Sequence, residues 1–282
     1  MIQVRVSTPE DVPAQRRLWK LAFGDEDAYL DNFYQNYYRP ERVLVLEEAG
    51  DIRAMTAWFD TQLVLPDGSR FRAAYLYAVS THPDFRGRGL AGQLLAGADR
   101  WFRRWDIPAV TTVPAEPSLH RFFGANGFRE CFVHDPRHWE GEGANPLGLT
   151  LRPLPPGEYA QAREARLAGT VHIFLPREAA AYQEGASRLS GGGLYALSTP
   201  GAETLLCTEG LPDGRLLVKE LLGPEESRDA ALSALPLLLP NWSGDYRIPG
   251  ETVPFGMLKW LDPERERAWN WNTKGYLGLA FD

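Results

Sequence analysis

The residues best suited to chemistry in this 282-residue chain form the glycine-rich stretch RGRGLAG at positions 86–92. Its glycines, Gly87, Gly89 and Gly92, have the spacing of the dinucleotide fingerprint G-x-G-x-x-G. Apolar residues recur at helical spacing after it, so the stretch opens a helix whose unpaired N–H groups and positive dipole end attract an anion. Arg86 and Arg88 add positive charge. The pattern predicts a loop that binds a diphosphate.

A nicotinamide dinucleotide does not fit this loop. In a dinucleotide-binding β-α-β unit the first glycine follows the strand directly. Here the expected strand AAYLYAVS ends near Ser80, and the polar stretch THPDFR intervenes before Gly87. The strands expected upstream form an antiparallel meander, which is also unlike a parallel β-α-β unit. The diphosphate must therefore belong to another ligand.

The same stretch fits R-x-x-G-x-A through Arg86, Gly89 and Ala91. At these residues the chain resembles the GNAT superfamily of N-acetyltransferases, over residues 1–135 in element order and over LYAVSTHPDFRGRGLAGQLL in residue detail. The resemblance implies that the loop binds the pyrophosphate of acetyl-coenzyme A through backbone N–H groups. Those groups belong to Gly87, Arg88, Gly89, Leu90, Ala91 and Gly92. The alternative is an ordinary glycine-rich turn between a strand and a helix.

The resemblance also assigns a role to the strand before the loop. In the family this strand splays from its neighbour, and its free backbone groups hold the pantetheine arm and the thioester carbonyl. The matching positions are Val79, Ser80 and Thr81, whose amides would act as oxyanion donors. The alternative is that Val79 and Tyr77 are simply core-facing strand residues.

Acyl transfer to an amine needs a base for the amine and an acid for the leaving thiolate. In many relatives the acid is a tyrosine four residues before a Gly-Phe pair, but here that position is Phe123, before Gly127-Phe128. His120 is the best local substitute, and Glu116 could act as a base or anchor the substrate ammonium. A surface histidine, a solvated carboxylate and a mechanism through water remain as alternatives. Glu47 and Glu48 are poorer candidates.

The second half of the chain repeats the pattern of strand, hairpin, P-D-G turn, strand and helix, which indicates a diverged internal duplication. Its segment KELLGPEES lacks the arginine and glycines of the loop, so we expect no second coenzyme site. The arrangement resembles tandem GNAT proteins, in particular the enhanced intracellular survival acetyltransferases, whose chain-terminal carboxylate enters the active site. By that resemblance Asp282, at the end of the alternating stretch GYLGLAFD, is a candidate carboxylate. A plain edge strand is the alternative.

Helical and alternating patterns place these residues in an α+β fold with a mixed sheet. We expect a GNAT domain over residues 1–140 and a diverged GNAT-like domain over residues 150–282, joined by a stretch rich in Gly and Pro. The aromatic segment NFYQNYY and the WNW at 269–271 are read mostly as core. Acids near the former could instead hold a cationic acceptor: Asp25, Glu26, Asp27 and Asp31.

The amino-acid composition limits the classes of partner that we expect. A net charge of −7 argues against nucleic acid, and no apolar run is long enough to cross a bilayer. Cys131 and Cys207 form neither a disulfide framework nor a metal motif, so we expect no metal and a cytoplasmic location. The leading hypothesis is an acetyl-CoA-dependent N-acetyltransferase acting on a primary amine of a small molecule or peptide. The alternatives are a non-catalytic acyl-CoA-binding module and an aminoacyl-tRNA-dependent transferase.

Overall fold

The computed structural model describes residues 2–140, 148–199, 201–238 and 243–281. The chain forms two compact units. The first unit comprises the residues up to Leu63 together with Arg70–Cys131 and Gly256–Thr273. The second unit contains Val64–Ser69, Phe132–Phe255 and the chain from Lys274 onward. The first unit thus includes Gly256–Thr273, a segment from late in the sequence.

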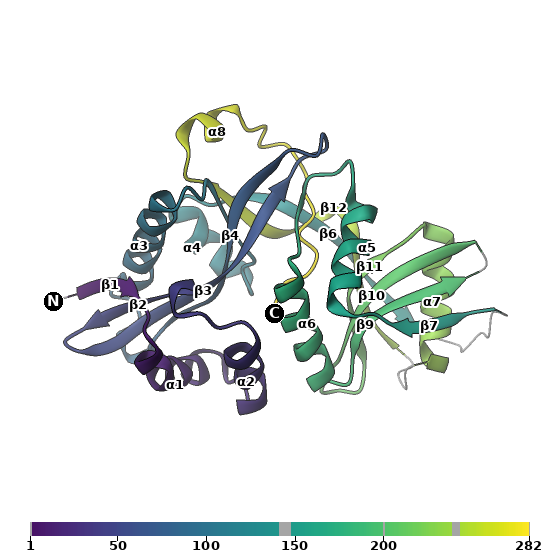
Figure 1. Ribbon diagram of the computed structural model, residues 1–282, viewed down its shortest axis with the longest axis horizontal. Coiled ribbons are helices and arrows are strands. Elements are labelled where there is room, and N and C mark those ends of the chain that lie inside the picture. Colours follow the sequence, from purple (N-terminus) through teal and green to yellow (C-terminus); the bar gives the residue numbers. More distant parts are fainter. Residues whose placement is uncertain (1, 141–147, 200, 239–242, 282) are drawn as a thin grey trace. The chain divides into compact units, whose positions relative to one another are not determined.

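The first unit is built on a mixed sheet (Figure 1). Its strands are β1 (Ile2–Val6), β2 (Val43–Glu48), β3 (Asp51–Val64), β4 (Arg70–Thr81), β5 (Ala109–Thr112) and the last part of β12 (Ser243–Trp260). They lie side by side in that order, with β1, β2 and β3 antiparallel, β4 and β5 parallel, and β5 and β12 antiparallel. This sheet confirms the predicted α+β class.

Helices cover both faces of this sheet. In Figure 1, α1 (Val12–Phe23) and α2 (Asp27–Asn36) lie on one face, and α3 (Leu90–Arg104) and α4 (Pro117–Ala125) lie on the other. The predicted apolar stripe of α3 is buried at Leu90, Leu94, Leu95, Ala98 and Phe102. Trp105 continues the same helical spacing, but it follows the helix and is 53% exposed. The spacing thus identified the buried face of α3 but extended it one turn too far.

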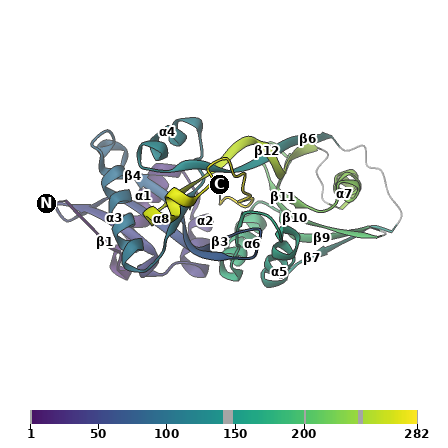
Figure 2. The same ribbon diagram turned by 90° about the horizontal axis from the view of Figure 1, so that it is seen from above.

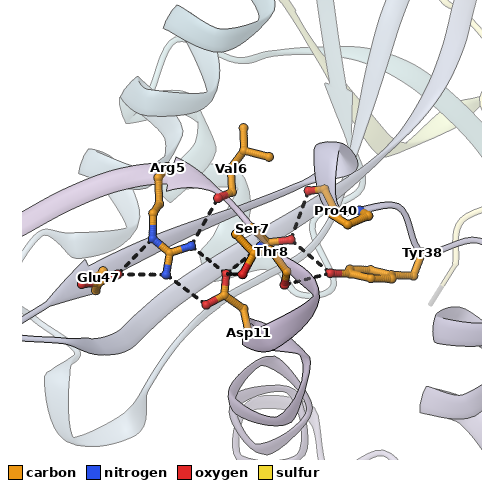
Figure 3. Close-up of polar contacts among 8 residues, drawn as sticks. All are labelled: Arg5, Val6, Ser7, Thr8, Asp11, Tyr38, Pro40 and Glu47. Carbon is orange, nitrogen blue, oxygen red and sulfur yellow. Dashed lines mark hydrogen bonds and ion pairs between the residues drawn. The ribbon is translucent and has the colours of Figure 1, made fainter.

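One arginine joins the first strand to the start of α1 (Figure 3). Arg5 on β1 contacts Glu47 on β2 at 2.9 Å and Asp11 at 2.6 Å. Asp11 also accepts a hydrogen bond from the Thr8 amide at 2.7 Å, closing a capping box over the 3₁₀ turn Pro9–Asp11 that leads into α1. Thr8 is therefore the N-cap of this turn, and Pro9 occupies its first position.

The second unit has a related strand pattern. Its sheet has the order β12, β11 (Leu216–Leu222), β10 (Ala202–Gly210), β9 (Gly193–Thr199), β7 (Thr150–Pro153). Only β11 and β12 are parallel in this set. Figure 2 shows α5 (Pro156–Leu167) and α6 (Arg177–Leu189) on one face and α7 (Glu225–Leu238) on the other. A parallel pair next to antiparallel strands, with helices on both faces, thus occurs in each unit.

Three regions differ from the sequence-based prediction. Helix α6 and the long strand β12 were not predicted, and β12 pairs with β6 (Arg129–Glu140). The expected terminal strand GYLGLAFD is wrong, because among the described residues only Gly275 and Tyr276 form isolated bridges. Gly278 has a φ of +74°, which interrupts the extended backbone. Asp282 lies outside the described residues.

The remaining short elements are β8 (His172–Ile173) and α8 (Pro263–Ala268). No helix within the described ranges has both the length and the apolar composition needed to span a membrane. Within those ranges, no group of three histidine, cysteine or acidic side chains is arranged to hold a metal ion.

Candidate functional site

The glycine-rich loop leaves backbone N–H groups available at the start of α3. A 3₁₀ turn at Pro83–Phe85 precedes the loop, and the amide of Arg86 bonds back to it. The next backbone amide with a recorded upstream carbonyl partner is that of Gln93, 3.1 Å from the Gly89 oxygen. Within the described chain, no recorded hydrogen bond uses the amides of residues 87–92. Those six donors and the positive end of the helix dipole form an anion-binding geometry.

Two glycines give this loop its shape. Gly87 and Gly89 have φ angles of +75° and +73°, a region that side chains with a Cβ rarely adopt. A Cβ on either residue would meet no atom within 4 Å, so the backbone conformation and not crowding requires glycine there. Gly92 is helical, and a Cβ on it would lie 3.4 Å from the side-chain oxygen of Asn126.

The two arginines of the loop differ in what they contact. Arg88 forms a two-point ion pair with Glu48 at the end of β2, with distances of 2.7 and 3.0 Å. This pairing lowers the pKa of Glu48. Arg86 donates from Nε to the Thr81 carbonyl at 3.3 Å, while its other guanidinium nitrogens have no recorded partner among the described residues. Arg86 is thus the better placed of the two to offer charge to an anion.

Strand β4 separates from β5 just before the loop. Parallel pairing runs from Ala73 and Ala109 to Tyr75 and Thr111, while β4 continues to Thr81. Ala78 has a φ of +50°, an uncommon conformation for a residue with a Cβ. Beyond it lie Val79, Ser80 and Thr81, and the buried hydroxyls of Ser80 and Thr81 have no recorded partner in the described structure. The edge of β4 that faces away from β3 is therefore open next to the anion-binding loop.

A splayed parallel pair followed by a helix that opens on free amides is the arrangement expected from the resemblance. Residues 3–127 match the family model described as an acetyltransferase (GNAT) domain. This part of the chain is a GNAT domain. A search of curated proteins found no significant match to the sequence.

Solved structures support the fold over nearly the whole chain. Eis1 from Mycobacterium abscessus aligns with a TM-score of 0.69 and 14% identity, covering 95% of this chain and 75% of that one. A GCN5-related N-acetyltransferase from Kribbella flavida aligns with a TM-score of 0.67 and 17% identity, covering 93% of this chain and 71% of that one. A GCN5-related N-acetyltransferase from Anabaena variabilis aligns with a TM-score of 0.69 and 14% identity, covering 93% of this chain and 73% of that one. These likenesses extend through both units, as expected for tandem GNAT-like domains.

The candidate acid and base residues of the GNAT domain have different surroundings. His120 on α4 pairs through Nδ1 with Glu130 on β6 at 2.8 Å. Glu116 is exposed at the N-cap of α4 and makes no side-chain capping bond. The structure records no contact between His120 and Glu116, and their catalytic assignment stays a prediction, as does the assignment of residues 79–81 and 86–92 to coenzyme binding.

Phe123, at the position where many relatives have tyrosine, belongs to the core of the GNAT domain. It is 4% exposed, and its ring centroid lies 5.2 Å from that of Phe122 and 5.4 Å from that of Phe128. A phenylalanine in this apolar setting provides no proton donor. The acid of any reaction in this domain must therefore come from a different side chain or from water.

Sequence reasoning missed two pairings in the GNAT domain. Lys259 on β12 bonds to Asp99 on α3 at 2.6 Å and to the carbonyl of Asn126 at 2.7 Å, which ties the two helices together behind the loop. The hydroxyls of Tyr29 on α2 and Tyr77 on β4 lie 3.0 Å apart. The alternation of side chains along β4 could have predicted that Tyr77 lies on the sheet face opposite α3. No feature of the sequence predicts its hydrogen bond with Tyr29.

Proposed function

We propose that the protein is an acetyl-CoA-dependent N-acetyltransferase that transfers the acetyl group to a primary amine of a small molecule or peptide. The observation that carries this proposal is the row of free amides at residues 87–92, directly after the splayed end of β4. The two cysteines, Cys131 and Cys207, are both free, buried thiols, which fits a reducing cytoplasm.

In this proposal the loop holds the diphosphate of the coenzyme. The amides of residues 87–92 donate to its oxygens, and the guanidinium of Arg86 adds a charge-assisted contact. Positive φ at Gly87 and Gly89 lets the backbone approach the phosphates without a side chain between them. The adenosine and pantetheine parts then extend away from a fixed anchor, which positions the thioester.

The open edge of β4 would receive the thioester. The amides of Val79 and Ser80 would donate to its carbonyl oxygen, which becomes an oxyanion when the amine attacks. Fixed donors of this kind are worth about 3–4 kcal/mol of barrier in acyl transfer. The amine nitrogen forms a bond to the carbonyl carbon, the carbon–sulfur bond breaks, and a proton moves from nitrogen to sulfur.

Two proton transfers accompany these steps. His120, held by Glu130, would act as the acid, and Glu116 would accept a proton from the amine or hold its ammonium form. The carboxylate of Asp282 would act as a base, by resemblance to the enhanced intracellular survival group. The acceptor is expected to be cationic before reaction, which suits the net charge of −7.

A second candidate function is a non-catalytic acyl-CoA-binding module, and the buried Phe123 favours it. An aminoacyl-tRNA-dependent transferase is less consistent with the acidic chain, because tRNA binding relies on basic surfaces.

Calorimetry with acetyl-CoA, followed by thiol-release assays over a panel of amines, separates these functions. Binding with turnover supports the N-acetyltransferase, and binding without turnover on any amine supports the binding module. Gly89→Trp should abolish coenzyme binding while the protein stays folded by circular dichroism. Unchanged affinity in Gly89→Trp would contradict the proposed site.

A further inference from the structure

Two phenol side chains meet beside the open end of β4. The hydroxyl oxygen of Tyr77 on β4 lies 3.0 Å from that of Tyr29 on α2, and both side chains are half-buried. Tyr77 immediately precedes Ala78, where φ is +50°, and Val79 follows. A hydrogen-bonded pair of titratable hydroxyls thus adjoins the backbone that we assign to the thioester.

The ring of Tyr77 is fixed by aromatic neighbours. Its centroid lies 5.4 Å from that of Trp19 on α1, 5.5 Å from that of Phe59 on β3 and 6.0 Å from that of Phe33 on α2. Thr56 on β3 also donates from Oγ1 to the Tyr77 carbonyl at 3.2 Å. Because aromatic packing holds the ring and this hydrogen bond holds the backbone, the hydroxyl of Tyr77 is held in one place.

Strand alternation sets the face on which this hydroxyl lies. Ala74 and Leu76 belong to the core cluster that contains the buried face of α3. Tyr77 alternates with them and contacts aromatic rings of α1 and α2, so it projects from the opposite face of the sheet. A substrate on that face would meet the Tyr77 hydroxyl before any group of α3.

Three carboxylates close to α1 and α2 in the sequence are engaged elsewhere. Asp25 accepts a hydrogen bond from the Trp19 indole at 2.7 Å. Asp27 pairs with Lys20 at 2.7 Å, and Asp31 pairs with Arg16 at 2.8 Å. Arg16 also reaches Asp27 at 3.0 Å. The phenols of Tyr29 on α2 and Tyr77 on β4, in contrast, are hydrogen-bonded to each other.

We propose that Tyr77 and Tyr29 are catalytic residues that carry the proton from the attacking amine to the leaving sulfur, in place of Glu116 or Asp282 as the base and His120 as the acid. This inference rests on the proposed N-acetyltransferase function. The amine nitrogen bonds to the carbonyl carbon and gives its proton to the Tyr29 oxygen. Tyr29 passes its hydroxyl proton to Tyr77, and Tyr77 gives its own to the sulfur as the carbon–sulfur bond breaks. The products are an acetamide and free coenzyme A, and both phenols are restored.

The chemistry of phenol suits this role. A tyrosine hydroxyl has an ordinary pKa of about 10, so it is protonated at neutral pH and can donate while it accepts. Deprotonation of either phenol would remove the proton destined for sulfur. The rate constant kcat should therefore fall at alkaline pH in the wild type.

The test compares three variants that keep the aromatic ring. Tyr77→Phe and Tyr29→Phe each remove one hydroxyl of the pair. Tyr34→Phe is the matched control, because Tyr34 lies in the same aromatic cluster but its hydroxyl donates to Gln15. Each variant is assayed with acetyl-CoA and the best amine of the panel from pH 7 to pH 10.5, and coenzyme affinity is measured by calorimetry.

We expect Tyr77→Phe to lower kcat by about 100-fold, to remove its alkaline decline and to leave coenzyme affinity within twofold. Tyr29→Phe should lower kcat less, and Tyr34→Phe should stay within about twofold. A kcat for Tyr77→Phe equal to wild type, or an unchanged alkaline decline, would overturn this inference while leaving the proposed function intact. If the wild type binds no acetyl-CoA, or transfers acetyl to no amine, both proposals fail.

Discussion

Arg88 and Glu48 form a two-point ion pair across the base of the glycine-rich loop, with oxygen–nitrogen distances of 2.7 and 3.0 Å. The pair joins the end of β2 to the residue between the two glycines with positive φ. Its effect is structural as much as electrostatic, because it fixes the side chain of Arg88 against β2. The charge that this arginine could offer to a phosphate is partly balanced by Glu48.

Arg86 and Arg88 should therefore contribute unequally to coenzyme binding. Arg86→Met should weaken acetyl-CoA binding by about tenfold, because a charge-assisted contact to the diphosphate is lost. Arg88→Met should weaken it by about threefold or less, since Glu48 already offsets the charge of Arg88. Calorimetry in about 0.1 M salt measures both, and a larger loss in Arg88→Met would show that its ion pair opens when the coenzyme binds.

Two of the glycines in the loop, Gly89 and Gly92, offer a second comparison. Gly89→Ala places a Cβ at a φ of +73°, which costs about 1 kcal/mol, and the methyl group also stands near the phosphate site. Gly92→Ala enters a helical position where its nearest recorded neighbour is 3.4 Å away. We expect thermal stability and coenzyme affinity to fall in Gly89→Ala and to stay near wild type in Gly92→Ala. Equal affinities would mean that the phosphates do not approach residue 89.

The sequence predicts local features of this site and not its distant pairings. The helical spacing after Gly89 identified α3, and the same positions are buried in the structure. The Thr8 cap and the turn at Pro66-Asp67-Gly68 also depend on neighbours only a few residues apart. Such features follow from the sequence because their energies are local.

The long-range contacts have no comparable signal. Lys259 lies 160 residues from Asp99, and Tyr29 lies 48 residues from Tyr77. Strand β12 was missed because Pro249 and Pro254 interrupt its alternation, and proline removes a donor from the sheet. The terminal stretch was predicted as a strand from its alternation alone, yet Arg163 bonds to the Leu277 carbonyl at 2.8 Å and Gly278 turns the chain.

Lys259 should stabilise the GNAT domain through its two contacts. Its side chain is 14% exposed and that of Asp99 is 15% exposed, so Lys259→Met leaves a poorly solvated carboxylate without its partner. We expect a loss of about 2 kcal/mol in unfolding free energy. Lys20→Met is the control, because the Lys20 pair with Asp27 is largely exposed and should change stability by under about 0.5 kcal/mol. Urea denaturation measures both, and equal losses would argue against the role of Lys259.

The Arg5–Asp11 pair of Figure 3 predicts a dependence of stability on pH. The hydrogen bond from Arg5, aided by the Thr8 amide, lowers the pKa of Asp11 below its ordinary value of 3.8. A carboxyl with a lower pKa in the folded state stabilises the fold above its unfolded pKa, and this stabilisation is lost as the pH falls through the folded pKa.

Asp11→Asn should therefore cost about 1 kcal/mol near pH 7, and this cost should shrink as the pH falls below about 4. Denaturation of the variant and the wild type at several pH values from 7 to 2.5 measures the difference. Asp67→Asn provides the control, because Asp67 accepts a hydrogen bond from the Ser69 amide in an exposed turn and has no recorded cationic partner. A cost for Asp11→Asn that is constant over this pH range would contradict the assignment.

In the second unit, Glu220 should be the residue whose loss destabilises the fold most. Its carboxylate lies 2.9 Å from the Arg163 guanidinium and 2.8 Å from the Tyr159 hydroxyl, and both charged side chains are almost fully buried. Glu220→Gln keeps the shape but leaves the Arg163 charge uncompensated, which should cost about 3–5 kcal/mol. Glu184→Gln, in an exposed pair with Arg188, should cost under about 0.5 kcal/mol.

A thiol probe makes this prediction specific to the second unit. Cys207 is buried on β10, and burial raises the pKa of its thiol, so it reacts only when the unit opens. We expect Cys207 in Glu220→Gln to react with a thiol reagent about 100-fold faster than in the wild type, as read from its tryptic peptide by mass spectrometry. Cys131 lies in the first unit and serves as the internal reference. Equal acceleration at both cysteines would indicate global unfolding, and no acceleration at either would mean that the buried pair does not stabilise the second unit.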